Sequence, residues 1–315
     1  MKNASRPTNI LSRFWIYQAE RFPVFGNGLL IAAFSFSAVS FSMLLRGVKT
    51  WPALNTVIVC FASAFFSFLQ LRLADEFKDF GEDSRYRPYR PVPRGLVSLR
   101  ELGIIWALTG ALQLGLAIWL NPALVPLLVI VWTYLGLMSK EFFVRDWLKA
   151  HPITYMWTHM IIVPLIDFYT TACDWRAAGQ LAPHAGLTWF LIASFFNGIV
   201  IEIGRKIRAP QDEEHGVETY TFLWGRRRAV LAWLGALALT ALCASVAAVE
   251  IGFLVPAGLL LTIAFITTVV VALRFLQDPI TQHAKLIETT SGLWTILMYL
   301  SVGALPLLIR VVFRN

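Results

Sequence analysis

Residues 52–83 of the chain read PALNTVIVCFASAFFSFLQLRLADEFKDFGED. The apolar part, residues 52–72, carries a single charged side chain, and it stands at the very end. About 20 consecutive apolar residues are enough for a helix to span a bilayer. Acidic residues follow at once in residues 73–83. The stretch therefore predicts a transmembrane helix with a polar site at one end.

Apolar runs of this kind recur along the whole chain. Of its 315 residues, 57% are hydrophobic and 15% are charged, which is the composition of a membrane protein and excludes a soluble domain. The runs lack the alternating pattern of a membrane β-barrel, so helices must satisfy the backbone groups inside the bilayer. We therefore predict an all-α membrane protein, a bundle of nine transmembrane helices. The spans are expected at residues 22–45, 52–72, 101–120, 122–139, 152–172, 187–204, 229–249, 252–273 and 289–309.

The basic residues predict an orientation. Most of the 27 Lys and Arg side chains fall before the first span and in the loops after the second, fourth, sixth and eighth spans. By the positive-inside rule this side faces the cytoplasm. We expect a multi-pass protein of the plasma or inner membrane, with residues 1–21 as a cytoplasmic N-terminal segment. The loops after the second and sixth spans also hold many acids, which contribute little to orientation and therefore indicate a site.

The first of these loops places Asp75, Asp79 and Asp83 at four-residue steps. If the preceding helix continues, side chains at i and i+4 share one face, so at least the first two converge, with Glu76 beside them. Converging oxygen ligands next to a phosphate are typical of Mg²⁺. The alternative is a solvated acidic helix end that is paired with neighbouring bases such as Lys78.

Four arginines follow in a segment that prolines stiffen, and residues 84–95 read SRYRPYRPVPRG. Arginine suits two-pronged contacts with phosphate oxygens. An acidic metal-binding face next to such a segment is the combination needed to hold a magnesium diphosphate and to neutralise its charge as it leaves. The candidate diphosphate ligands here are Arg85, Arg87, Arg90 and Arg94.

These residues resemble the first motif of the UbiA-type prenyltransferase superfamily, which has the form NxxxDxxxD and precedes a basic stretch with an RPLPSG-like turn. The chain has Asp75-xxx-Asp79-xxx-Asp83 and then RPVPRG at residues 90–95, in the same order and place. Asp75 stands where the family usually has Asn, and the interval before residue 90 is shorter than usual. The resemblance implies that these three aspartates are catalytic and bind Mg²⁺, together with Glu76.

The second acidic motif of the family, commonly DxxxDxxxGxxT, follows the sixth span. The chain has RAPQDEEHGVET at residues 208–219. The resemblance implies that Asp212 binds metal, but Arg208 stands where the family has an acid. Three further charged residues crowd just upstream, namely Glu202, Arg205 and Lys206. We expect this segment to be salt-bridged or to bind the diphosphate through its three basic residues.

Single polar residues elsewhere are weaker candidates. Tyr134 and Lys140 end the fourth span and resemble a family segment whose lysine faces the diphosphate. The alternative is a lysine that only reaches the membrane surface. Ionisable residues inside a span are functional candidates by default, which adds His159 and Asp167. Asn197 in the sixth span completes the set.

The resemblance implies a single UbiA-like domain over residues 1–315. It also implies a Mg²⁺-dependent transfer of a prenyl group from a polyprenyl diphosphate to an aromatic or other lipophilic acceptor. A UbiA-type terpene cyclase would use the same ionisation, and a non-catalytic transporter or lipid-binding protein of the same fold would lack it. Few acids lie inside the predicted spans, which disfavours an ion-coupled carrier. The expected partners are the diphosphate, the acceptor and the lipid bilayer, with no nucleic acid.

Overall fold

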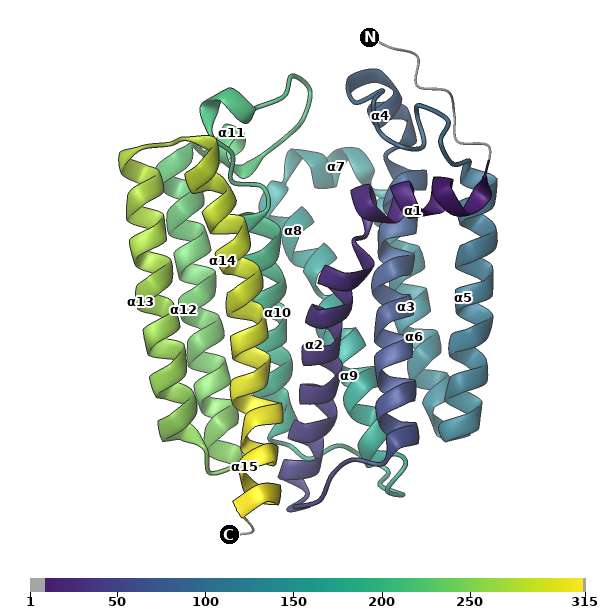
Figure 1. The fold of residues 1–315 in the computed structure, drawn as a ribbon, viewed down its shortest axis with the longest axis vertical. Coiled ribbons are helices and arrows are strands. Elements are labelled where there is room, and N and C mark those ends of the chain that lie inside the picture. Colours follow the sequence, from purple (N-terminus) through teal and green to yellow (C-terminus); the bar gives the residue numbers. More distant parts are fainter. Residues whose placement is uncertain (1–8, 314–315) are drawn as a thin grey trace.

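The computed structural model describes residues 9–313 of the chain, and this part forms helices and no strands. Residues 1–8 of the expected N-terminal segment lie outside it. Within residues 9–313, eight helices are long and apolar enough to cross a membrane. They pack side by side, and the short helices α4, α7 and α11 gather at one end of the bundle, which we call the loop end (Figure 1). The predicted all-α membrane bundle is thus confirmed, whereas the prediction of one domain over residues 1–315 stays a prediction.

The eight long helices follow the predicted apolar runs closely. They are α2 (Val24–Leu45), α3 (Leu54–Lys78), α5 (Leu99–Leu120), η1 with α6 (Pro122–Ser139), α10 (Leu187–Gly204), α12 (Arg226–Glu250), α13 (Leu254–Gln277), and α14 with η4 and α15 (Thr281–Phe313). The shorter elements are α1 (Ile10–Arg21), α4 (Phe80–Tyr86), η2 (Glu141–Phe143), α7 (Arg145–Ala150), α8 (Pro152–Met160), α9 (Ile162–Trp175), η3 (Pro210–Asp212) and α11 (Tyr220–Trp224).

The ninth predicted span, residues 152–172, is not one long helix. It is divided into α8 and α9, which meet at Ile161. Pro164 explains the break, because proline has no N–H to donate to the carbonyl of Met160 and its ring clashes with that turn. Figure 1 shows α8 nearer the loop end and α9 deeper in the bundle. Where nine spans were predicted, the described residues thus form eight long helices and one divided pair, and the exact count of nine is not confirmed.

The hairpin expected at residues 121–122 is present. Asn121 leaves the helical conformation, with φ −165° and ψ 119°, and Pro122 begins the next turn. The Asn121 side chain accepts a hydrogen bond from the N–H of Ala123 at 2.9 Å. An amide cap followed by proline at the first helical position is a strong local helix start. This is why the long apolar run is two antiparallel helices.

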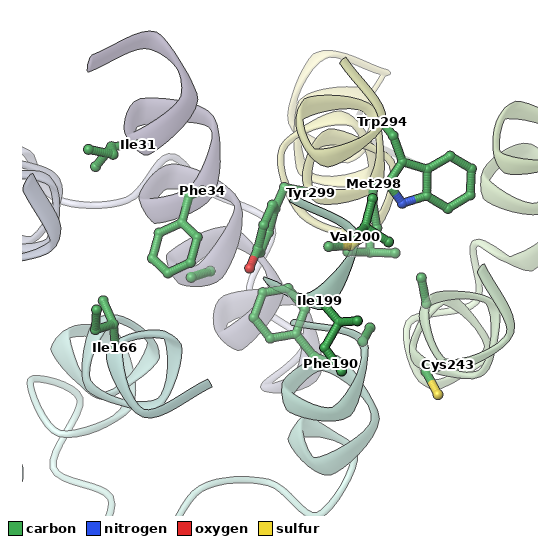
Figure 2. Close-up of a cluster of buried hydrophobic side chains, with 14 of the residues drawn as sticks. Ile31, Phe34, Ile166, Phe190, Ile199, Val200, Cys243, Trp294, Met298 and Tyr299 are labelled. Atoms are coloured by element: carbon green, nitrogen blue, oxygen red, sulfur yellow. The ribbon is translucent and has the colours of Figure 1, made fainter. Parts of the chain in front are cut away.

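Aromatic side chains fill the centre of the bundle. Phe34 and Phe190 both pack against the ring of Tyr299, with ring centroids 5.0 and 5.8 Å away (Figure 2). The Tyr299 hydroxyl donates to Asp167 at 2.7 Å and lies 3.1 Å from the Ser194 hydroxyl. Asp167, a candidate from the sequence, therefore lies inside the core rather than among the loops.

One contact of the core requires glycine. A Cβ atom at Gly303, in the π-helical turn η4 (Leu300–Ala304), would overlap the backbone of Ser37 in α2. Small residues allow membrane helices to approach backbone to backbone, and that approach is a main source of their packing energy. Gly303 therefore fixes the distance between α2 and the last long helix.

The helix α1 lies across the loop end (Figure 1). Its Arg13 pairs with Glu101 of α5 at 2.7 Å, and its Arg21 pairs with Glu76 of α3. Because α3 and α5 come later in the chain, α1 joins two membrane helices from outside the bundle.

Candidate active site

The first acidic segment begins as a helix and then breaks. As expected, α3 continues past its apolar part, and Asp75 lies in its last turn. Asp79 follows as the C-cap, and its N–H donates to the carbonyl oxygen of Asp75 at 2.9 Å. The chain then starts α4, which carries Asp83. Asp75 and Asp79 are therefore one helical turn apart, whereas Asp83 belongs to a separate helix.

Asp75 and Asp79 are the acids of this segment that are loosely held. Asp75 lies 3.3 Å from Arg72 and 3.7 Å from Lys78. Within residues 9–313, the Asp79 carboxylate has no ion pair or side-chain hydrogen bond. Burial raises the pKa of the Asp79 carboxyl. The positive charge of Lys78 opposes this shift, and the negative charges of Asp75 and Asp83 add to it. An unpaired acid next to another acid is a place where a cation would be stabilised.

Glu76 and Asp83 are held by arginines instead. The Glu76 side chain is 1% exposed and pairs with Arg21. The Asp83 side chain is 2% exposed and lies between Arg87, at 2.9 Å, and Arg90, at 2.6 Å. The assignment of these two acids to a metal site stays a prediction. In this structure each would have to leave an arginine before it could bind a metal ion.

The other arginines of residues 84–95 also bind the protein. Arg94 pairs with Glu20 at 2.8 Å and donates to the carbonyl oxygen of Tyr89 at 2.8 Å. The Arg85 guanidinium lies 5.2 Å from the ring centre of Tyr86. The segment is therefore a folded, internally braced loop, and its role as a diphosphate clamp is untested.

At the end of α10, one buried acid holds two cations. Glu202 lies 2.5 Å from Arg205 and 2.8 Å from Lys206. The Lys206 ammonium is also 5.5 Å from the ring centre of Tyr220. The Glu202 carboxylate raises the pKa of the Arg205 guanidinium, and Asp75 across the site adds to this shift. The basic end of α10 therefore faces the acidic end of α3.

The loop after α10 is organised by an acid that the sequence did not single out. Glu213 accepts hydrogen bonds from the hydroxyls of Thr219 and Thr221 at 2.7 Å. Asp212, the expected metal ligand, accepts from Thr281 of α14 at 3.0 Å instead. Among the residues described, the Arg208 side chain makes no ion pair. Arg208 is thus the more available of the two charged motif positions.

The two acidic loops meet. The Tyr89 hydroxyl donates to Glu214 at 3.0 Å, and the rings of Tyr86 and His215 are 6.1 Å apart. Gly216 has φ +79°, and a Cβ there would lie 2.6 Å from the Tyr86 ring, so glycine is needed for this contact. Segments that are more than a hundred residues apart in the chain therefore build one region at the loop end.

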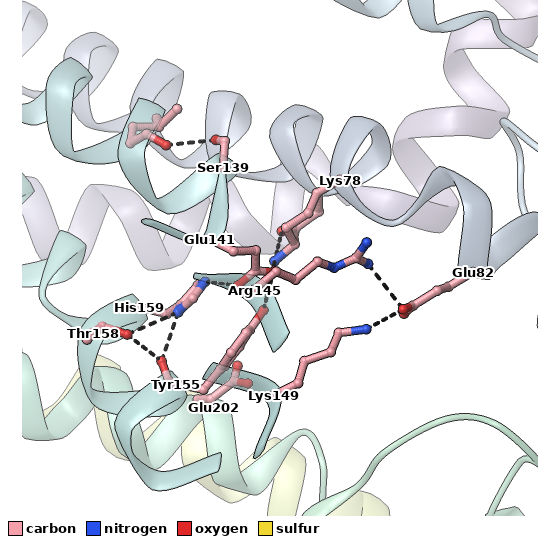
Figure 3. Close-up of polar contacts among 12 residues, drawn as sticks. Lys78, Glu82, Ser139, Glu141, Arg145, Lys149, Tyr155, Thr158, His159 and Glu202 are labelled. Atoms are coloured by element: carbon pink, nitrogen blue, oxygen red, sulfur yellow. Dashed lines mark hydrogen bonds and ion pairs between the residues drawn. The ribbon is translucent and has the colours of Figure 1, made fainter. Parts of the chain in front are cut away.

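A third group of polar residues joins this region from below, and most of it was missed from the sequence. Lys78 donates to the Tyr155 hydroxyl at 2.9 Å and lies 3.4 Å from Glu141. The Tyr155 hydroxyl donates to Glu141 at 3.1 Å, and its ring stacks on His159 at 3.9 Å (Figure 3). Tyr155 and His159 stand at i and i+4 in the divided span, and this spacing was the available signal.

The turn that presents Glu141 is strained. Glu141, Phe142 and Phe143 have φ of 50°, 52° and 61°, the left-handed region that side chains other than glycine rarely adopt. Such residues cost about 1–3 kcal/mol each and persist where the surrounding structure holds them, often at functional sites. The Phe142 ring packs edge-on against Tyr134 and His159.

The remaining candidates lie at the margins. Lys140 is exposed at the C-cap of α6. The Tyr134 hydroxyl donates to the carbonyl oxygen of Thr158 at 2.7 Å. Asn197 is buried and accepts from Thr295 at 3.3 Å. In residues 9–313 no three His, Cys, Asp or Glu side chains are grouped as a ready metal cage.

Comparison with known proteins settles the family. The profile of the UbiA prenyltransferase family matches residues 32–287. The chain belongs to the UbiA prenyltransferase family. It is therefore a membrane-embedded transferase of the UbiA type. No curated protein is significantly similar to it in sequence.

Solved UbiA structures share the fold at low sequence identity. The apo structure of a UbiA homolog from Aeropyrum pernix K1 aligns over 87% of this chain and 96% of its own, with 17% identity and a TM-score of 0.66. A digeranylgeranylglyceryl phosphate synthase aligns over 93% and 99%, with 16% identity and a TM-score of 0.59. A UbiA homolog from Archaeoglobus fulgidus aligns over 87% and 98%, with 17% identity and a TM-score of 0.52.

Proposed function

We propose that the chain transfers a prenyl group from a polyprenyl diphosphate to a lipophilic acceptor, and that the reaction takes place at the loop end between α3 and α10. The observation that carries this proposal is the contact between the two acidic loops through Tyr89 and Glu214. That contact encloses an acidic helix end and a basic helix end in one region. A magnesium diphosphate needs both kinds of charge.

Asp75 and Asp79 are the residues that would hold Mg²⁺. Mg²⁺ is usually bound by one or two carboxylates together with substrate phosphates, rather than by an all-protein cage. Two acids on successive turns, one loosely paired and one unpaired, fit that requirement. When bound, the ion would supply positive charge that stabilises the leaving diphosphate. Glu76, Asp83 and Asp212 are less suitable because each already has a protein partner.

The basic end of α10 would bind the diphosphate oxygens directly. Arg205 and Lys206 are fixed by the buried Glu202, so their positions are set before the ligand arrives. Arg208 has no competing ion pair among the residues described. The substitution of a cation for the family's usual acid therefore favours an anion site on this side. Lys140 and Arg85 are further candidates for the same ligand.

The loop end should face the cytoplasm, as the distribution of Lys and Arg predicts. The prenyl tail would then enter the apolar bundle while the diphosphate stays at the loops. The digeranylgeranylglyceryl phosphate synthase of the same fold supports a lipid-soluble acceptor. Reporter tags near Asp83 and Asp212 should both score cytoplasmic. Tags that score on opposite faces would remove the single site.

Ligand-induced stabilisation tests the proposal directly. Farnesyl or geranylgeranyl thiolodiphosphate, which does not ionise readily, should raise the melting temperature in detergent only when Mg²⁺ is present. Asp75→Ala and Asp79→Ala should each abolish this increase. Glu82→Gln, which removes an acid that pairs with Arg145 and Lys149 on the surface, is the matched control. Equal stabilisation of wild type and both aspartate variants would refute the proposed metal site.

A further inference from the structure

Two buried hydrogen-bond acceptors face each other beside the proposed site. The Nδ1 atom of His159 lies 2.8 Å from the carbonyl oxygen of Tyr155. A carbonyl only accepts, so Nδ1 carries the hydrogen, and the Nε2 atom of a neutral ring is then a bare acceptor. Nε2 lies 3.5 Å from the Oε2 atom of Glu141. Neither atom has a protein hydrogen-bond partner within residues 9–313.

Both side chains of this pair are buried, so leaving their facing acceptor atoms without a hydrogen-bond donor costs free energy. Glu141 is 4% exposed and His159 is 6% exposed. Buried polar atoms are nearly always hydrogen-bonded, and an unpaired one costs about 1–3 kcal/mol. One proton placed between Nε2 and Oε2 would satisfy both atoms with a charge-assisted hydrogen bond. The pair is therefore built to take up a single proton.

Tyr155 connects the pair to the site. Its hydroxyl donates to the other oxygen of Glu141, at 3.1 Å, and accepts from Lys78, at 2.9 Å. The Tyr155 side chain is only partly buried, unlike Glu141 and His159. Lys78 in turn lies 3.7 Å from Asp75, the proposed metal ligand. Two hydrogen bonds thus lead from Lys78 through Tyr155 to Glu141 (Figure 3), and the ion pair of Lys78 with Asp75 joins them to the proposed site.

The charged groups around His159 disfavour its protonation in the resting enzyme but can stabilise a short-lived protonated ring. Four titratable groups lie around His159 in the part of the chain that the structure describes, namely Lys78 of α3, Glu141 of η2, Tyr155 of α8 and Glu202 of α10. The positive charge of Lys78 disfavours a resting imidazolium, whereas the two carboxylates stabilise one once it forms.

Resting on the proposed function, we propose that Tyr155, Glu141 and His159 form a relay that removes the proton which the acceptor loses during prenyl transfer. An acceptor atom forms a bond to the allylic carbon of the donor. The acceptor then loses a proton, either from that same atom or from a hydroxyl conjugated with it, and the electron pair of the broken bond to hydrogen stays on the acceptor. The proton passes to the Tyr155 oxygen as the proton of that hydroxyl moves to Oε1 of Glu141, and rotation of the resulting carboxyl group then brings it beside Nε2 of His159. The carbon–oxygen bond of the donor breaks, and its electron pair leaves with the diphosphate.

The relay separates donor binding from transfer, and this separation can be measured. Tyr155→Phe and Glu141→Gln should keep the Mg²⁺-dependent stabilisation by farnesyl thiolodiphosphate, because neither residue is a proposed ligand of the diphosphate. Transfer to a panel of lipophilic phenols should lose about 100-fold or more in kcat, the usual range for a general base, with KM for the donor nearly unchanged. The matched control is Tyr299→Phe, which removes another hydroxyl that donates to a carboxylate, that of Asp167 in the core of the bundle.

The pH dependence distinguishes a relay from a structural network. Wild-type transfer should fall as pH is lowered, because a relay that already holds its proton cannot accept another, and His159→Gln should remove that limb of the profile. Variants that keep kcat within about threefold and an unchanged profile would overturn the relay but leave the proposed function intact. A wild type that binds the thiolodiphosphate but transfers to no acceptor would also overturn it. A wild type that does not bind the thiolodiphosphate would instead refute the proposed function.

Discussion

Replacing Glu76 with alanine should destabilise the protein rather than remove a metal ligand. The Glu76 side chain is 1% exposed and its partner Arg21 is 7% exposed, so the substitution leaves a buried guanidinium without a counter-charge. Removing one partner of a buried ion pair costs about 3–5 kcal/mol, because the remaining charge is not solvated. Glu76→Ala should lower the unfolding free energy by about this amount, with or without Mg²⁺.

Denaturant unfolding in detergent, followed by helical circular dichroism, would measure the loss. The double variant Arg21→Met with Glu76→Leu should recover most of it, since apolar residues of similar volume often replace a buried pair at little cost. The folded Glu76→Ala protein should still bind farnesyl thiolodiphosphate with Mg²⁺. The reasoning would be refuted by a variant whose stability changes by less than about 0.5 kcal/mol but whose Mg²⁺-dependent binding is lost. Glu76 would then be the metal ligand that the sequence suggested.

Three further predictions follow from the geometry. Because the pKa of the Asp79 carboxyl is raised, acidification should weaken the Mg²⁺-dependent binding of the thiolodiphosphate already at a higher pH than for an ordinary aspartate, and binding titrations across pH test this. Without metal, the Asp79→Asn variant should be more stable than wild type at pH values above the raised pKa and equally stable in acid, and melting curves across pH test this. Lys206→Ala should weaken thiolodiphosphate affinity by about tenfold at low ionic strength and by less in 1 M salt, and an effect on melting temperature alone would assign it a structural role. Gly303→Ala should lower the free energy of unfolding by about 1–3 kcal/mol, because the new Cβ atom would overlap the backbone of Ser37. Gly292→Ala should not destabilise the protein, because its Cβ atom would meet open space.

The span positions were predictable because the bilayer imposes a length on each apolar run. The turn at Asn121 and Pro122 was predictable for a second reason, since an amide cap and a proline act locally. Pro164 was also visible in the sequence as a possible helix break. It was missed because the residues on both sides are apolar, and hydropathy gives no information about a backbone hydrogen bond that proline cannot make.

The candidate site was harder to predict because the ion-pair partner of a charged side chain depends on the tertiary structure and can be distant in the sequence. The sequence places Asp75, Asp79 and Asp83 at equal steps, but the helix ends between the second and the third, and Asp83 turns to Arg87 and Arg90. The cation that an acidic cluster requires can be a distant arginine as well as a metal ion. No sequence pattern pairs Glu76 with an arginine 55 residues earlier.

The group around Glu141 was missed for a related reason. Only His159 was a candidate, and the other members look ordinary alone: an acid beside a helix end, a lysine just before an aspartate, and a tyrosine in an apolar span. Their meaning comes from the left-handed turn at residues 141–143, which aims one carboxylate at the other three side chains. A strained backbone of this kind follows from tertiary packing and has no local signature.

The position of α1 has a consequence for how the protein is made. Arg13 binds an acid 88 residues further along the chain, in a helix that enters the membrane only after α2 and α3. At about 5–20 residues per second, the ribosome needs about 4–18 s to supply that partner after Arg13 has emerged. During this interval α1 must wait in water at the membrane surface with its arginines hydrated. The helix α1 is thus synthesised before its partner and docks fully only when α5, the third long helix described, is in place.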